Sequence, residues 1–173
     1  DFWNLPVVPS GPRSAPLLIV GLAPGLQGAN RTGVPFEGDA SGNLLQAALK
    51  RLNLVGQVRI TNVLKCLPRQ NKPTTAELNR CHGYIEQELK DFIGQGGHAI
   101  FAVGRVAHER VLKVLGFKQS AFAFGHGAVH ELSDPLWLID TYHCSRYNTQ
   151  TGRITPAMFE EALSCAARLA VAA

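Results

Sequence analysis

The chain lacks the features by which several large classes of protein are recognised. Four cysteines spread over 173 residues are too few for a disulfide scaffold, and they fit a reducing cytosol. No apolar run approaches the ~20 residues that a membrane-spanning helix needs, so we expect no membrane association. Residues 1–6 contain neither a basic segment nor an apolar segment, so no signal peptide is visible. The chain has no Gly-Lys-Ser or Gly-Lys-Thr loop, which argues against a P-loop nucleotide-binding domain.

Charged residues are not abundant either, at 17% of the chain, whereas hydrophobic residues make up 46%. This composition is ordinary for a folded soluble protein. The length predicts one domain, residues 1–173, large enough to bury its own core. The formal net charge of +4 is compatible with nucleic acid or another polyanion as a partner, but it does not select one of them.

Short apolar segments alternate along the chain with longer segments of helical period. The segments expected to form strands cover residues 17–20, 59–64, 99–103 and 137–140. The segments expected to form helices cover residues 43–52, 75–93, 105–115 and 156–171. Residues 1–16 are rich in Pro, Gly and Ser, which is typical of an extended arm. The alternation predicts an α/β fold, a three-layer α/β/α sandwich around a central, mainly parallel four-stranded sheet.

The most informative stretch is residues 17–39. Its apolar strand runs into a loop, Gly21-Leu22-Ala23-Pro24-Gly25, in which glycine permits a positive φ and proline fixes φ. An aromatic ring, Phe36, and a carboxylate, Asp39, follow three residues apart. These groups together suit a pocket for a flat polar ligand at the carboxyl edge of a sheet. A glycine-rich connection that only turns the chain explains the stretch equally well.

Polar residues follow the other strands as well, and the ends of parallel strands share one edge of a sheet. Asn62 offers a donor and an acceptor for reading a nucleobase, although an amide that satisfies backbone groups is the simpler explanation for this residue alone. The imidazole of His143 can stabilise an oxygen that gains negative charge, unless it is merely packed. Arg146 and Tyr147 suit a nucleic-acid backbone or a stacked base, or else an ordinary solvated loop tip.

Together these motifs resemble those of the family-five (type-b) uracil-DNA glycosylases, in order over residues 3–169. Residues 21–39 resemble the first family motif, and residues 142–158 resemble the second, where the family commonly has His-Pro-Ser or His-Val-Ser. Residues 65–81 resemble the cluster-binding segment. The resemblance implies a DNA repair enzyme that flips uracil out of DNA and hydrolyses its N-glycosidic bond. It further implies uracil-containing DNA as partner, abasic DNA as product, a monomer, and a cytoplasmic location at the bacterial nucleoid.

The resemblance also implies roles for individual residues. Asp39 matches the carboxylate near the sugar, His143 the residue that stabilises the uracil O2, and Phe36 the ring that stacks on the base. Ala23 stands where other members of the superfamily carry an acid or amide that activates water, which adds weight to Asp39. The residues expected to bind the substrate are Gly21, Leu22, Ala23, Pro24, Gly25, Phe36, Asn62 and Asn71. The residues expected to bind DNA are Asn30, Arg31, Ser145, Arg146, Tyr147 and Asn148.

Two features depart from the family pattern. Asn62 occupies a position where type-b enzymes usually have Ala and where type-a enzymes have an Asn that pairs with uracil O4 and N3, which suggests tighter selection of uracil. The family also carries a four-cysteine [4Fe-4S] cluster, and Cys66 and Cys81 match two of its ligands. Cys66 and Cys81 alone do not make a metal site. By the resemblance the other two ligands would lie upstream of Asp1; the alternative is that this member carries no cluster.

The sequence therefore predicts a uracil-DNA glycosylase, a hydrolase that acts on one bond only. The alternative is a non-catalytic protein that binds abasic or single-stranded DNA in the same cleft. Release of free base from a uracil-containing duplex distinguishes the two, because only the enzyme produces it.

Overall fold

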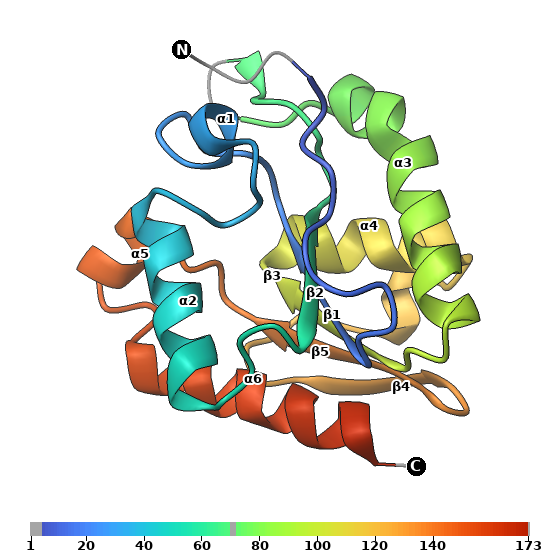
Figure 1. Ribbon diagram of the computed structural model, residues 1–173. Helices are drawn as coiled ribbons and strands as arrows, with labels where there is room; N and C mark the ends of the chain where they lie inside the picture. The colour runs from blue at the N-terminus through green and yellow to red at the C-terminus, as the bar shows by residue number, and fades with distance from the viewer. Residues whose placement is uncertain (1–4, 70–71, 173) are drawn as a thin grey trace.

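The computed structural model describes residues 5–69 and 72–172, and a five-stranded sheet forms its centre (Figure 1). Its strands are β1 (Leu17–Gly21), β2 (Val58–Asn62), β3 (Ala99–Val103), β4 (Val129–Ser133) and β5 (Leu136–Thr141). They lie in the order β2-β1-β3-β5-β4, and all but β4 are parallel. Gly21 pairs with Asn62, and Val103 pairs with Thr141, so the carboxyl ends of the parallel strands reach the same edge.

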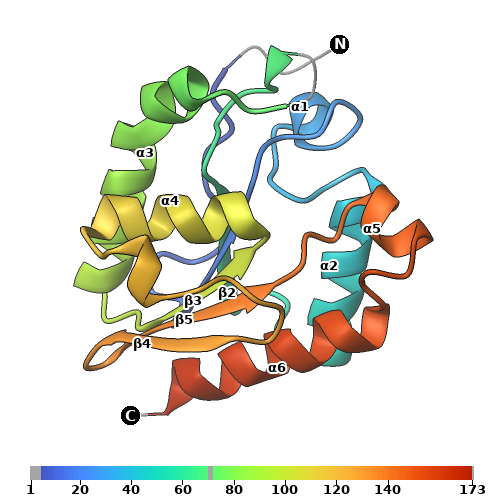
Figure 2. The ribbon, with the colours of Figure 1, turned by 180° about the vertical axis from the view of Figure 1, so that it is seen from behind.

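Helices cover both faces of this sheet (Figures 1 and 2). The longer helices are α2 (Ala40–Arg51), α3 (Thr75–Gly94), α4 (Arg105–Leu115) and α6 (Pro156–Val171). Successive side chains of a strand point to opposite faces, so Ile19 joins the core formed with α2 and α6. Its neighbours Leu18 and Val20 join the core formed with α3 and α4. The predicted three-layer α/β/α arrangement is thereby confirmed.

The expectation of four strands is wrong, because β4 adds a fifth. β4 lies at the edge of the sheet and runs antiparallel to β5, pairing Val129 with Ile139 and His130 with Leu138. Of its five residues only Leu132 is buried. A strand with one buried side chain has little hydrophobic alternation, and this one follows directly on a glycine-rich segment. The sequence pattern therefore gave no strong signal for it.

The helices α2 and α3, which correspond to the first two predicted helical segments, each begin at a capping side chain. Asp39 Oδ1 accepts a hydrogen bond from the Gly42 amide at 2.9 Å and so caps α2. Thr74 and Glu77 form a reciprocal capping box at the start of α3. The cap on α2 has a consequence for the site, because it fixes one oxygen of the Asp39 carboxylate and leaves the other unused by the helix.

The described part of the N-terminal arm, residues 5–16, runs beside β2. The Val7 amide donates to the Lys65 carbonyl at 2.7 Å, and Ser10 and Ile60 exchange two backbone hydrogen bonds of 2.9 Å. This pairing covers the edge strand β2, whose backbone groups would otherwise be open to another chain. In the part of the chain that the structure describes, no helix has the length and apolar character needed to cross a membrane.

Candidate active site

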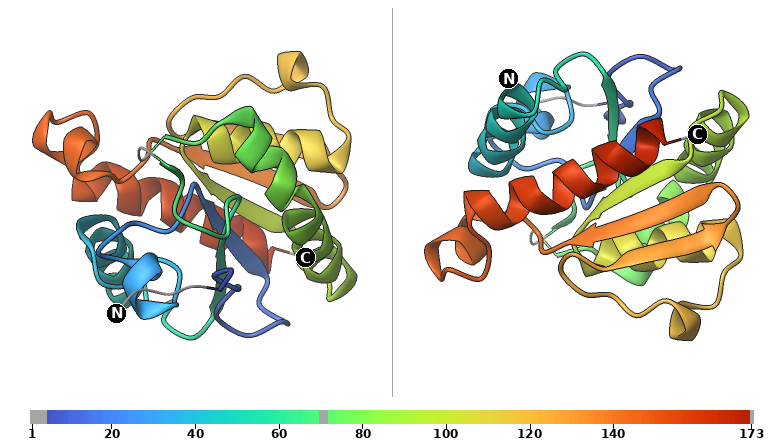
Figure 3. Two further views of the ribbon diagram at one scale, coloured as in Figure 1. Left: turned by 90° about the horizontal axis from the view of Figure 1, so that it is seen from above. Right: turned by 90° about the horizontal axis from the view of Figure 1, so that it is seen from below.

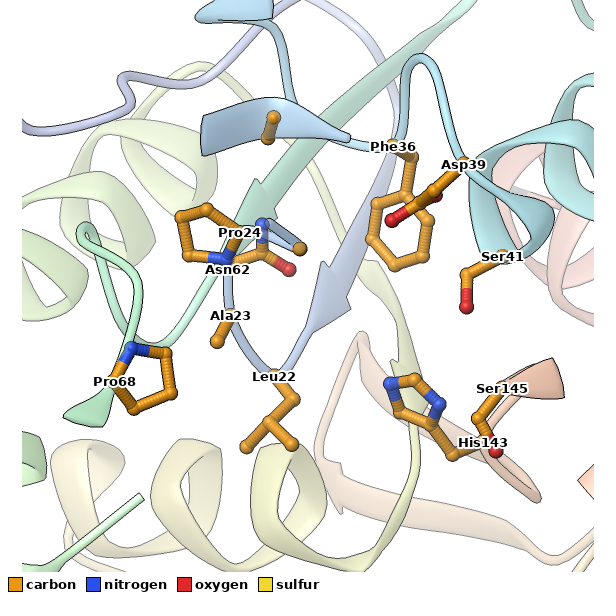
Figure 4. Close-up of a pocket in the computed structure, with 12 residues that line it drawn as sticks. Leu22, Ala23, Pro24, Phe36, Asp39, Ser41, Asn62, Pro68, His143 and Ser145 are labelled. Carbon is orange, nitrogen blue, oxygen red and sulfur yellow. The ribbon is translucent and has the colours of Figure 1, made fainter. Parts of the chain in front are cut away.

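A pocket of about 400 Å³ opens at the carboxyl edge of the sheet (Figure 4). The loops that leave β1, β2 and β5 enclose it, near two short helices, α1 (Ala29–Thr32) and α5 (Arg146–Gln150) (Figure 3). Both short helices lie in stretches that were expected to be loops. The pocket is lined by Leu22, Ala23, Pro24, Gly25, Ala29, Phe36, Asp39, Ser41, Asn62, Pro68, His143 and Ser145. Segments from both ends of the chain therefore meet in one cavity.

Phe36 forms one wall of the pocket and is only 8% exposed. A β-carbon at Gly21 would collide with this ring and with the Asn62 amide, so only glycine fits there. A β-carbon at Gly42 would lie 2.6 Å from the Phe36 carbonyl oxygen, which excludes a larger residue there as well. The φ angle of Phe36 is 56°, a left-handed conformation that costs a non-glycine residue about 1–2 kcal/mol. The surrounding packing holds the ring in this position despite that cost.

Asp39 places a carboxylate in the pocket beside Phe36 (Figure 4). Its Oδ1 is the α2 cap, and its Oδ2 lies against Gly25 and Gly28, where an added β-carbon would run into it. Two glycines thus make room for this one oxygen. Oδ2 has no hydrogen-bond partner among the described residues, and Asp39 is one of the residues that line the pocket.

Asn62 ends β2 in the pocket wall, with 3% of the residue exposed. Its Oδ1 is buried and, among the residues that the structure describes, has no hydrogen-bond partner. Its backbone carbonyl accepts a hydrogen bond of 2.6 Å from Lys65 Nζ, which also donates to Thr61 Oγ1 and to Glu88 Oε1. Burial lowers the pKa of Lys65, although Glu88 opposes the shift. A buried acceptor without a partner costs about 1–3 kcal/mol of folding free energy. A ligand that donates a hydrogen bond to Asn62 Oδ1 would therefore recover this cost.

His143 follows β5 and faces the pocket across from Phe36 (Figure 4). The Asn148 side chain donates to the His143 carbonyl at 2.8 Å and fixes the backbone there. A β-carbon on Gly104 would lie 3.3 Å from the His143 side chain, which shows how closely the end of β3 packs against it. Burial lowers the pKa of His143, and the Asp39 charge opposes this only in part. The imidazole is therefore neutral at pH 7 and has one N–H to donate.

A largely buried ionic network ties Asp140 of β5 to His108 of α4 and to His130 of β4. His108 Nδ1 donates to Asp140 Oδ1 at 2.7 Å, and His108 Nε2 donates to the Phe122 carbonyl at 2.8 Å. His130 Nε2 donates to the other Asp140 oxygen at 2.9 Å. Because both ring nitrogens of His108 face acceptors, both carry protons and the ring is charged. Burial acts to lower the pKa of His108, but its hydrogen bond and charge interaction with Asp140 raise it overall.

The structure brings most of the predicted substrate-binding and catalytic residues together. Those that line the pocket are Leu22, Ala23, Pro24, Gly25, Phe36, Asp39, Asn62 and His143. Gly21 lies directly behind the ring and the amide, and Asn71 falls outside the described residues. Ala29, Ser41 and Pro68 also line the pocket, although none of them was predicted to do so. All three lie in or beside stretches expected to be loops, and this was a usable signal for each of them.

The predicted DNA-binding residues lie around the mouth rather than at its base. Ser145 lines the pocket and caps α5, and Arg146 lines an adjoining hollow together with Asp39. Tyr147 is 74% exposed on α5. Asn30 and Arg31 lie on α1, and the Asn148 side chain donates a hydrogen bond to the His143 carbonyl. Their contacts with DNA remain predictions.

The cysteines that match a cluster lie outside the pocket. Cys66 is exposed and Cys81 is partly buried. Burial raises the pKa of the Cys66 thiol, and the nearby Cys81 raises it further, so the two side chains are close. Burial also raises the pKa of Cys144 to about 12, and Cys165 lies on α6. A [4Fe-4S] cluster takes four ligands, and the described residues bring together two, so they do not complete one.

Comparison with known proteins places the chain in a family. The sequence profile of the uracil DNA glycosylase superfamily matches residues 8–166. The chain belongs to this superfamily. It is 41% identical to a type-5 uracil-DNA glycosylase of Thermus thermophilus, over 98% of this chain and 82% of that protein. A type-5 uracil-DNA glycosylase of Mycobacterium leprae is 39% identical over 98% of this chain and 80% of its own length.

A more distant similarity links the chain to the type-4 proteins. A type-4 uracil-DNA glycosylase of Archaeoglobus fulgidus is 32% identical over 70% of this chain and 60% of its own length. The identity with this type-4 protein is lower, and it covers less of both chains, than with the two type-5 proteins. These findings confirm the predicted resemblance to family five.

Proposed function

We propose that the protein is a uracil-DNA glycosylase that hydrolyses the N-glycosidic bond of uracil in DNA and leaves an abasic site. Membership of the superfamily and the names of the relatives support this proposal. Within the site, the supporting observation is Asn62 Oδ1 in the pocket wall, which is buried and has no hydrogen-bond partner among the described residues. An acceptor held in that state calls for a ligand donor, and the N3–H of an everted uracil is such a donor.

The pocket accounts for recognition of the base. Phe36 stacks on the flat ring, Asn62 Oδ1 accepts from N3–H, and Asn62 Nδ2 donates to O4. The base must leave the double helix to reach this position, which costs a few kcal/mol and less at a mismatch. Cytosine offers an unprotonated N3 and an amino group at the same positions, so the amide as placed opposes it.

Cleavage of the bond places negative charge on the departing uracil. The neutral imidazole of His143 donates a hydrogen bond to the uracil O2 as this charge develops, a contribution of about 3 kcal/mol for one well-placed donor. Asp39 Oδ2 acts at the sugar, either by stabilising its oxocarbenium-like charge or by orienting the attacking water. Asp39→Asn distinguishes these roles, because the amide oxygen still binds water but carries no charge, and it still caps α2.

The test is release of free base from a duplex that carries labelled uracil. We expect the wild-type protein to release uracil and His143→Ala to slow the release by two or more orders of magnitude. Asp39→Asn should slow the release as much if the carboxylate stabilises charge on the sugar, and clearly less if it only orients water. Wild-type rates in both variants would overturn the proposed mechanism. Tight binding of abasic or single-stranded DNA without any release of base would overturn the enzyme assignment and support the non-catalytic alternative.

We also propose the partners and setting that this activity implies. DNA is the partner and abasic DNA the product, and the protein acts as a monomer in the cytoplasm at the nucleoid. Cys66 and Cys81 are proposed as two ligands of a [4Fe-4S] cluster whose remaining ligands lie outside the described residues. A brown colour and broad visible absorption of purified natural protein, lost in Cys66→Ser, test this last point.

A further inference from the structure

Two arginines beside the pocket are held by aromatic rings instead of by acids. The Arg105 guanidinium carbon lies 5.0 Å from the centre of the Phe124 ring, and that of Arg153 lies 4.8 Å from the centre of the Tyr142 ring. Both arginines are exposed. Within residues 5–69 and 72–172, neither forms an ion pair or a hydrogen bond. Their N–H groups are therefore free to bind a ligand of opposite charge.

The rings that hold the arginines form one connected cluster. Phe124 and Tyr142 lie 6.3 Å apart between centres, and His126 lies 5.1 Å from Tyr142 and accepts its backbone N–H at 3.2 Å. The buried His108 ring packs edge-on against Phe124 at 5.5 Å. The cluster is thus anchored to the ionic network in the core, which restricts the arginines before any ligand arrives. A side chain that is already restricted loses less conformational entropy when a ligand binds.

The position of this cluster relates it to the proposed active site. Tyr142 is the residue before His143, and Gly104, which packs on the His143 side chain, is the residue before Arg105. Figure 2 shows the segment that leads into β4 returning beside the end of β5, on the side of the molecule away from α1. The arginines therefore lie on the flank of the pocket opposite to the one that carries Arg31.

Arg105 also stands where its charge does not help the helix. It is the first residue of α4, and a cation at a helix N-terminus is disfavoured by about 0.3–1 kcal/mol because of the helix dipole. The one carboxylate a turn further along, Glu109, makes no ion pair with it among the described residues. The contact with the Phe124 ring offsets this cost by about 0.5–1 kcal/mol, and it leaves the edge of the guanidinium open to an anion.

We propose that Arg105 and Arg153 bind phosphate groups of the DNA strand on the β5 flank of the pocket, outside the set of contacts that the sequence analysis assigned. This inference rests on the proposed function, since it takes DNA as the ligand. A planar guanidinium that is restrained on a ring and open at its edge suits the paired oxygens of a phosphodiester. Each contact adds to affinity without reading the base sequence.

The experiment measures how salt weakens binding to a duplex that contains a stable abasic analogue. Each phosphate contact contributes about 0.9 to the slope of log affinity against log salt. We expect Arg105→Gln and Arg153→Gln each to reduce the slope by about 0.9 and the double variant by about 1.8. Between 50 and 200 mM salt, each single variant should therefore lose about 3.5-fold less affinity than the wild-type protein loses. Arg153→Lys, which keeps the charge, should retain most of the slope.

Arg168→Gln is the matched control. This exposed arginine lies in the last turn of α6, at the end of the molecule opposite to α1 and α5 (Figure 1), and its removal should leave the slope unchanged. A wild-type slope in both test variants, from a protein that still releases uracil, would overturn this inference alone. A wild-type protein that neither binds the duplex nor releases uracil would overturn the proposed function along with it. An equal loss of slope in Arg168→Gln would show that net charge, rather than these two positions, is responsible.

Discussion

Replacing Asn62 by alanine should separate the stability of the free protein from its action on uracil. In the free protein the Asn62 Oδ1 is buried without a partner among the described residues, at a cost of about 1–3 kcal/mol. Alanine removes that acceptor, and it leaves no closed cavity because the residue borders an open pocket. We therefore expect the free energy of unfolding to stay level or to rise by up to about 3 kcal/mol. Each kcal/mol raises the melting temperature of a chain of this size by about 2–4 °C.

The same substitution should impair catalysis. In the proposed complex the Asn62 side chain makes two hydrogen bonds to uracil, each with a net value of about 1–1.5 kcal/mol. Their loss amounts to about 2–3 kcal/mol, which lowers kcat/KM about 30- to 150-fold.

Thermal unfolding and uracil release, measured on the same preparation, give both quantities. Asn79→Ala provides the contrast, because this amide lies on α3 outside the pocket and accepts a hydrogen bond from Arg110. It should lose stability and keep its activity. An Asn62→Ala protein that is less stable than wild type and equally active would refute the reasoning.

Three further predictions follow from the site and its supports. Gly25→Ala places a β-carbon against Asp39 Oδ2, so uracil release should fall at least tenfold while the circular dichroism spectrum stays native. Gly83→Ala adds its β-carbon in open space, so it should keep both the wild-type rate of uracil release and the native spectrum. Lys65→Met removes the cation that neutralises Glu88, which is partly buried and keeps only the hydrogen bond from Thr61 Oγ1, so urea titration should show a loss of about 3 kcal/mol, and a loss below about 1 kcal/mol would contradict this. Because the folded-state pKa of His108 is raised, its stabilisation is full below its ordinary value of 6.5 and is lost as the pH rises through the raised value. The difference in unfolding free energy between wild type and His108→Gln should therefore shrink as the pH rises above about 6.5, and a constant difference would argue against a charged His108.

Local signals in the sequence were sufficient for most of the fold. The apolar run that forms β1 and the alternation of strands with helices predicted a mainly parallel three-layer architecture, which the structure confirms. β4 was not predicted, because an edge strand that buries one side chain has little hydrophobic alternation in its sequence. α1 and α5 were not predicted, because helices of four and five residues are too short to show a hydrophobic period.

The candidate site was predictable only in part. The rule that parallel strands end at one edge placed Phe36, Asn62 and His143 in one region, and they line one pocket. The supports behind them were not predictable. Lys65 reaches a glutamate 23 positions away, and His108 reaches an aspartate 32 positions away, so no spacing in the sequence marks either pair. Such pairs arise from the packing of α3 and α4 on the sheet.

The order of the strands explains why there is a hollow in which uracil could sit. β1 has β2 on one side and β3 on the other, and the chain reaches β2 through α2 on one face but reaches β3 through α3 on the opposite face. The connections that leave neighbouring strands therefore diverge, and the gap between them is a property of the winding itself. Insertions at the far rim, in the turns at residues 53–57 and 95–98, should leave that gap and its chemistry intact. These turns are accordingly the natural places to attach a fluorophore or a surface tether for watching single repair events.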